Sequence, residues 1–189
     1  GASEIVAITN GVHVPTWQDA RVGPALSADD ALWDVRAALK RELLAAVRER
    51  IGVQLDPDRL TIGFARRFAT YKRATLLLHD LGWLKEIVDR DQRPVVFIFA
   101  GKAHPRDGEG QEFASMVYRM SRRPESRGRI AILEEYDMRI GRELTSGCDV
   151  WLNNPIRPHE ASGTSGMKPP MHLGVNCSIL DGWWPEGFD

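Results

Sequence analysis

The run Pro94-Val95-Val96-Phe97-Ile98-Phe99-Ala100 carries no charge and consists mostly of β-branched and aromatic residues. An uninterrupted apolar run of this kind predicts a strand that is covered on both faces of a sheet, as strands of parallel sheets are. Shorter or weaker apolar runs flank it along the chain, at Leu60–Ala65, Ile130–Leu133, Val150–Leu152 and Cys177–Leu180.

Helical patterns alternate with these runs. Ser27, followed by Asp29 and Asp30, predicts the N-cap of a long amphipathic helix that ends near Gly52. Further helices are expected at Tyr71–Asp89, Gly110–Met120 and, from a fainter pattern, Met138–Ser146. This alternation predicts an α/β fold with a doubly wound, mostly parallel, Rossmann-like sheet, in which ligands bind in the loops after the strands.

The length of 189 residues suits one folded unit. The strand-like run Ile5–Pro15 contains an Asn-Gly turn signal at Asn10, and we expect it to form an edge strand or a connector. The expected division is therefore a connector over residues 1–26 and an α/β core over residues 27–189.

Composition narrows the classes of function. The formal net charge is −1 and the charges are interleaved, which argues against a nucleic-acid partner. The two cysteines, Cys148 and Cys177, match neither a zinc site nor a redox pair, so we expect no metal and a reducing compartment. Because no apolar run approaches the ~20 residues of a membrane span and no signal pattern opens the sequence, we expect a cytoplasmic protein without a membrane partner.

Two loops after predicted strands carry unusual chemistry. Arg66-Arg67-Phe68-Ala69-Thr70-Tyr71-Lys72-Arg73 places four cations where a strand gives way to a helix, which suits an anion but also a solvated turn. Pro158–Lys168 contains glycines and hydroxyls that could cradle a phosphate through backbone N–H groups. Lys168 ends this loop and could serve as a plain cation or, if desolvated, in Schiff-base chemistry. Glu160 could accept hydrogen bonds from sugar hydroxyls, although a lone glutamate is usually exposed.

Several motifs carry a resemblance to a known family. EASGTSGMK (Glu160–Lys168) resembles the pyridoxal-phosphate lysine motif of the α-glucan (glycogen, starch, maltodextrin) phosphorylases, and RRFATYKR resembles their phosphate-site motif. ITNGVHVPTW and GKAHP match two further segments in the same order, while DVWLNNP and DGWWPEG are similar to the shorter bacterial and archaeal branch.

The resemblance implies that this chain is most of the C-terminal domain of a two-domain (GT-B type) glycosyltransferase, without its N-terminal domain. It implies phosphorolysis of α-1,4-glucan by inorganic phosphate to give α-glucose 1-phosphate, with pyridoxal phosphate as cofactor on Lys168. The family's functional positions correspond to Arg67 and Lys72 for the substrate phosphate, to Arg66, Thr164 and Ser165 for the cofactor phosphate, to Glu160, Ser162 and Gly163 for glucose, and to Tyr136 near the cofactor.

The sequence departs from the family pattern at two places. Pro169 and Pro170 follow Lys168 and confine any helix to starting there. Asp137 follows Tyr136 where one family branch has an arginine, so an anion-binding charge is absent unless Arg139 substitutes.

Alternative functions remain open from sequence. A nucleotide-sugar-dependent glucosyltransferase of the glycogen synthase type shares the architecture but has no use for Lys168, and a non-catalytic excised domain would be inactive alone. Homo-oligomerisation is compatible with the sequence, which leaves glucan length and regulation undecided.

Overall fold

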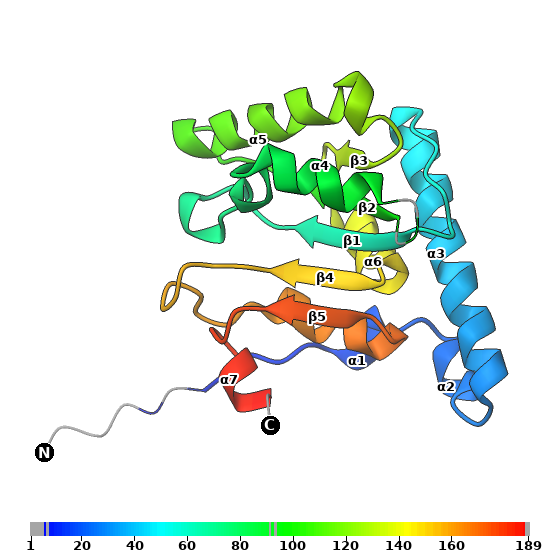
Figure 1. Cartoon of the computed structure of the whole chain (residues 1–189). Helices are drawn as coiled ribbons and strands as arrows, with labels where there is room; N and C mark the ends of the chain where they lie inside the picture. The colour runs from blue at the N-terminus through cyan, green and yellow to red at the C-terminus, as the bar shows by residue number, and fades with distance from the viewer. Residues whose placement is uncertain (1–5, 7, 91, 93, 188–189) are drawn as a thin grey trace, which may run out of the picture.

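The computed structural model describes residues 6, 8–90, 92 and 94–187. Its centre is a parallel sheet in the order β3-β2-β1-β4-β5 (Figure 1). The strands are β1 (Leu60–Ala65), β2 (Val95–Ala100), β3 (Ile130–Leu133), β4 (Val150–Asn153) and β5 (Val175–Ser178). This order confirms the predicted doubly wound parallel sheet.

The helices complete an α/β layered structure (Figure 1). The α-helices are α1 (Val14–Trp17), α2 (Val22–Ala25), α3 (Asp29–Ile51), α4 (Leu81–Asp89), α5 (Gly108–Ser121), α6 (Met138–Gly147) and α7 (Trp184–Gly187). Short 3-10 helices are η1 (Thr70–Lys72), η2 (Leu76–Leu78), η3 (Pro124–Ser126), η4 (Thr164–Met167) and η5 (Pro169–His172).

The strand β2, which the apolar run predicted, is buried at every position from Val95 to Ala100 because helices cover both faces of the sheet. Its even-numbered residues, Val96 and Ile98, join a core cluster with side chains of α3 and α6. Its odd-numbered residues, Phe97 and Phe99, join a second cluster with side chains of α4 and α5. Alternate side chains of one strand therefore fill two cores.

The long helix α3 begins later than the sequence predicts. Its N-cap is Ala28, which makes no side-chain cap, and Asp29 and Asp30 supply the acidic first turn. Ser27 is not the cap because its hydroxyl donates to the carbonyl of Pro24. Gly52, in the left-handed conformation at a φ of 67°, ends the helix where predicted.

The predicted single helix Tyr71–Asp89 is wrong. Arg73 has a φ of 49°, which ends η1 after one turn, and the chain then forms η2 before α4 begins. Asp80 caps α4 by accepting a hydrogen bond from the Trp83 amide at 2.9 Å. Apolar spacing alone could not distinguish these three short pieces from one helix.

Two smaller corrections concern strands. Within the strand-like run Ile5–Pro15, the described residues Val6 and Ile8–His13 form no strand, while Ile5 and Ala7 lie outside the described residues. The last strand begins at Val175, two residues earlier than the predicted Cys177, because Leu173 at a φ of 64° turns the chain out of η5. Within the described part of the chain, we find no helix with the length and apolar character needed to cross a membrane.

Candidate functional site

The candidate site lies where the order of the strands reverses, at the carboxyl ends of β1 and β4, which is where open α/β sheets bind ligands. The two loops that leave these strands are fastened to each other. Arg73 donates from Nε to the carbonyl of Asn154 at 2.8 Å and from Nη2 to that of Pro155 at 3.1 Å. Asn154 returns a hydrogen bond from Nδ2 to the carbonyl of Arg73 at 3.1 Å. These hydrogen bonds hold the basic loop after β1 against the glycine-rich loop after β4.

A buried charge cluster joins these loops. Arg66 donates from Nη2 to Oε2 of Glu160 at 2.8 Å, and Lys72 donates from Nζ to the same oxygen at 2.7 Å. The three residues are 5%, 8% and 8% exposed, respectively, so Glu160 is not the surface glutamate that its residue type favours. Two cations face one carboxylate, which leaves the cluster with a net positive charge.

Arg66 has unused capacity to bind an anion. Its Nη1 atom is buried and has no hydrogen-bond partner among the described residues. Burial lowers the pKa of Arg66, and the nearby Glu160 carboxylate partly opposes this effect. The guanidinium therefore presents a desolvated donor next to the glycine-rich loop.

Glu160 is held in place from the other side of the loop. Its backbone amide donates to Oδ2 of the buried Asp181 at 3.0 Å, and the amide of Gly182 donates to Oδ1 at 2.9 Å. Gly163 lies close by at a φ of 69°, and an added Cβ there would sit 3.1 Å from Cγ of Glu160. The positive φ favours glycine at this position, and a larger residue would also press on the Glu160 side chain.

Lys168 follows η4 and projects against the connector. Its Nζ lies 3.3 Å from the centroid of the Trp17 ring, which closes α1 (Val14–Trp17). Burial lowers the pKa of Lys168 from 10.5 to about 8. The negative face of the ring favours the charged amine by about 0.5–2 kcal/mol, so it opposes burial without cancelling it.

Tyr136 lies beside the same tryptophan. An added Cβ at Gly141 would be 3.0 Å from the Tyr136 hydroxyl oxygen and 3.9 Å from the Trp17 ring, so the two aromatic side chains converge over the start of α6. Burial, with a smaller contribution from the Asp137 carboxylate, raises the pKa of Tyr136. The connector thus brings an aromatic surface to the lysine, which the sequence pattern did not reveal.

The remaining predicted residues fall into two groups. Ser162, Gly163, Thr164 and Ser165 are half-buried in the loop between Glu160 and Lys168. The Ser162 hydroxyl is buried without a partner among the described residues. Arg67 is exposed and lies outside the charge cluster, and we find no ion pair between it and another described residue.

Asp137, which stands where one family branch has an arginine, and the nearby Arg139 both lie at the start of α6. Asp137 caps α6 by accepting a hydrogen bond from the Ile140 amide at 2.8 Å. Arg139 is exposed and donates to Glu143 at 2.8 Å on the same helix. These two positions are thus engaged locally in α6.

The loop after β2 supports the site through its backbone. An added Cβ at Gly101 would lie 2.1 Å from the carbonyl oxygen of Arg66, so this glycine permits the close approach of the two loops. Lys102, one of the cations in this loop, is exposed and pairs with Glu135 at 3.1 Å. Lys102 is therefore paired with a different carboxylate from the one that Arg66 and Lys72 share.

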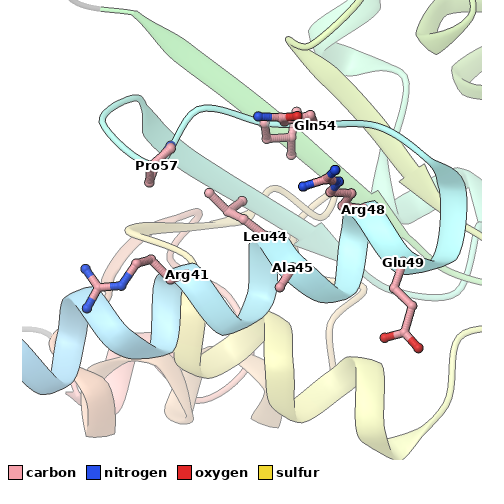
Figure 2. Close-up of a pocket in the computed structure, with 8 residues that line it drawn as sticks. Arg41, Leu44, Ala45, Arg48, Glu49, Gln54 and Pro57 are labelled. Atoms are coloured by element: carbon pink, nitrogen blue, oxygen red, sulfur yellow. The ribbon is translucent and has the colours of Figure 1, made fainter.

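A surface pocket away from the Glu160 cluster is a weaker candidate for a ligand site. It lies beside α3 and has a volume of about 500 Å³. Its lining residues, most of which are labelled in Figure 2, are Arg41, Leu44, Ala45, Arg48, Glu49, Gln54, Leu55 and Pro57. It borders the loop that enters the amino end of β1, the edge opposite to Glu160. Within the described ranges, no group of three or more His, Cys, Asp or Glu side chains could hold a metal ion.

Comparison with known proteins gives a consistent result. Residues 25–184 match the family model described as carbohydrate phosphorylase. The chain is 43% identical to the maltodextrin phosphorylase of Thermococcus litoralis and 43% identical to the glycogen phosphorylase of Mycobacterium bovis, each over 98% of this chain and 26% of the relative. It is 39% identical to the glycogen phosphorylase of Aquifex aeolicus over 96% of this chain and 32% of the relative. The chain therefore spans between a quarter and a third of the length of these relatives.

Proposed function

The chain belongs to the carbohydrate phosphorylase family, and from this premise we propose that it forms the cofactor-bearing part of an α-1,4-glucan phosphorylase. The proposed reaction cleaves a terminal α-1,4 bond with inorganic phosphate and releases α-glucose 1-phosphate. The observation that carries the proposal is that the segment between β4 and β5 contains both the desolvated Lys168 amine and the Glu160 carboxylate of a buried, net positive cluster.

Pyridoxal phosphate fits the residues that are present. A lysine whose pKa is lowered to about 8 has a usable neutral fraction near neutral pH, which suits reaction with an aldehyde. The Nη1 atom of Arg66 is buried without a hydrogen-bond partner among the described residues, and a desolvated guanidinium donor of this kind suits a phosphate. We propose that Lys168 holds the cofactor, with Arg66, Thr164 and Ser165 at its phosphate and Tyr136 beside its ring. When bound, it would supply a phosphate with a second pKa near 6, suited to proton exchange.

The charges of the chain suit the approach of a second phosphate. Two phosphate dianions repel each other, and fixed cations lower that repulsion without reorganising during the reaction. Lys72 lies in the buried cluster, and we propose that it binds the substrate phosphate together with Arg67, which is exposed on the same loop. The same cations would stabilise charge that develops as the glycosidic bond breaks.

Glu160 has two roles in this proposal. Its carboxylate aligns Arg66 and Lys72 by accepting a hydrogen bond from each. With Ser162 and Gly163 it would also bind glucose hydroxyls, since carboxylates accept such bonds well. The rest of a phosphorylase chain would close the site and hold the glucan. The proposal includes a cytoplasmic location, which the free cysteines Cys148 and Cys177 support.

The test uses a full-length phosphorylase that contains this sequence. Purified protein should convert maltodextrin and phosphate into glucose 1-phosphate, and borohydride reduction should fix a pyridoxyl group on the peptide that contains Lys168. Lys168→Arg should abolish both results, whereas Lys102→Arg, the same change at an exposed lysine, should preserve them. Glucosyl transfer from a nucleotide sugar, with none from phosphate, would place the protein in the synthase class instead.

A further inference from the structure

His172 lies in η5, four residues after Lys168, and is only 2% exposed. The backbone amide of Asp19 donates to its Nε2 at 3.0 Å, and its Nδ1 lies 3.2 Å from the carbonyl oxygen of Lys168. An amide N–H can only donate and a carbonyl can only accept, so Nε2 accepts and Nδ1 donates. The two bonds together require a neutral imidazole with its hydrogen on Nδ1.

These bonds connect two segments that are distant in sequence. On one side of His172 is the backbone of Lys168. On the other is Asp19, two residues after Trp17. The centroid of the Trp17 ring lies 3.3 Å from Nζ of Lys168. The histidine therefore links the Lys168 backbone to the connector segment around Asp19. That segment also carries Trp17, whose ring packs against the Lys168 amine.

We propose that His172 is a positioning residue that holds the connector against Lys168 and so keeps the lysine amine under Trp17. The proposal rests on the proposed function only in taking Lys168 as the reactive residue. Without this tie, the connector would separate from the lysine loop and the amine would become solvated.

The surroundings of His172 favour the neutral ring. The main effect is burial, which lowers its pKa, and the Arg36 guanidinium acts in the same direction. The carbonyls of Lys168 and Trp17 and the carboxylate of Asp19 act in the opposite direction. Side chains of α2 and α3 complete the environment, namely Val22, Leu32, Val35 and Leu39. Because burial prevails, the acceptor at Nε2 remains available at neutral pH.

A second attachment of the connector is weaker. Arg21 bonds Asp19 at 2.7 Å and Glu42 of α3 at 2.6 Å, and all three side chains are partly exposed. Exposed ion pairs contribute little because water screens them. The bond to His172, whose ring is 2% exposed, should therefore hold the connector more firmly than these ion pairs do.

The experiment measures the Lys168 amine in the 189-residue chain. The rate of reductive methylation by formaldehyde and cyanoborohydride is followed at Lys168 by peptide mass spectrometry from pH 6 to 11, which gives the pKa of the amine. The expected value for the unchanged chain is about 8. His172→Phe keeps an aromatic ring but removes both hydrogen bonds, and it should raise this pKa by at least one unit. Each unit lowers the neutral fraction, and the methylation rate at pH 7, about tenfold.

Three variants separate positioning from general packing. His172→Gln retains one donor and one acceptor and should keep the rate within about threefold of the unchanged chain. Arg21→Gln, which removes only the exposed attachment, should have no effect on the Lys168 rate. Asp19→Pro removes the amide donor from outside the core and should raise the Lys168 pKa as His172→Phe does. This variant also decides the question if His172→Phe does not fold.

A Lys168 pKa that stays near 8 in Asp19→Pro, or in a folded His172→Phe, would overturn the proposal. The measurement needs neither phosphate nor glucan. Failure of phosphorolysis would therefore leave it intact, and its own failure would leave the phosphorylase assignment untouched.

Discussion

Replacing Lys168 with Met should stabilise the chain at neutral pH. Burial lowers the pKa of Lys168 in the folded chain from 10.5 to about 8. Between these two values the unfolded chain binds more protons than the folded one, so the free energy of unfolding rises with pH across this window. Below pH 8 the buried amine is charged and its full cost is present. Met has a similar length, no charge and a thioether that packs well on an aromatic ring such as that of Trp17.

The size of the effect follows from the same shift. A change from 10.5 to about 8 corresponds to at most about 3.4 kcal/mol at about 1.36 kcal/mol per unit. The amine is only half-buried, so water screens part of this cost. Attraction between the charged amine and the Trp17 ring offsets a further part of this cost, about 0.5–2 kcal/mol. We therefore expect Lys168→Met to raise the free energy of unfolding by about 1–2 kcal/mol at pH 7.

Urea unfolding of the 189-residue chain at pH 7 and pH 10 tests this reasoning. The stability difference between Lys168→Met and the unchanged chain should shrink by more than half at pH 10, since most of the amine cost has then disappeared. Lys102→Met controls for the loss of an exposed lysine. A Lys168→Met variant that is less stable at pH 7, or a difference that is the same at both pH values, would refute the account of a desolvated amine.

Three further predictions concern the charge cluster and the extent of the site. Lys72→Ala in a full-length phosphorylase should reduce turnover with phosphate by about 30- to 1000-fold, or about 2–4 kcal/mol, with glucan binding retained; steady-state kinetics in phosphate and glucan will show whether the loss is specific. Asp181→Asn weakens the acceptor that holds the Glu160 amide; it should lower kcat with pyridoxal phosphate content unchanged, and loss of cofactor would contradict this. The 189-residue chain alone should form no glucose 1-phosphate. Correct orientation of the substrate can remove ~7–11 kcal/mol of the activation barrier, and it depends on the rest of the enzyme. Turnover within tenfold of a full-length reference would show that the chain contains the whole site.

The fold was predictable because the strongest pattern in the sequence, an uninterrupted apolar run, corresponds to a strand that is buried along its whole length. The run at residues 94–100 is uniformly apolar, and β2 is covered on both faces. Where the chain forms short turns the pattern failed. The stretch from Tyr71 has apolar residues at helical spacing, but Arg73 adopts a positive φ and Lys72 is drawn into a buried ion pair. Tertiary contacts, rather than local preference, decide the conformation there.

For the candidate site, the sequence indicated candidate residues but not how they are arranged. Arg66, Lys72 and Glu160 were chosen by resemblance to a family, and the structure adds that they share one carboxylate oxygen. His172 and Asp181 were missed because their roles arise from contacts with segments far away in the chain. A histidine four residues after the predicted lysine and an aspartate that follows an apolar run were the only local signals.

A second buried charge cluster, at the amino edge of the sheet, shows what a purely structural arrangement looks like here. Asp149 accepts from Arg36 at 2.8 Å, from Lys40 at 2.7 Å and from the Thr61 amide at 2.8 Å. Arg36 also donates to the carbonyl of Gly147 at 3.2 Å. No side-chain atom of Arg36, Lys40 or Asp149 is among the buried polar atoms without a partner. Satisfied in this way, the cluster fastens α3 to β4 and β1.

The cluster at the carboxyl edge has the same composition, two cations and one carboxylate, but its hydrogen-bonding groups are less fully satisfied. Arg66 retains a buried donor that has no partner in the part of the chain that the structure describes. A buried ion pair adds little to stability compared with apolar residues of similar size, and an unsatisfied donor costs about 1–3 kcal/mol more. Stability alone therefore does not explain why Arg66, Lys72 and Glu160 are gathered at the point where strand order reverses. A requirement to bind an anion does, because a phosphate would supply the acceptor that Arg66 lacks and offset the net positive charge.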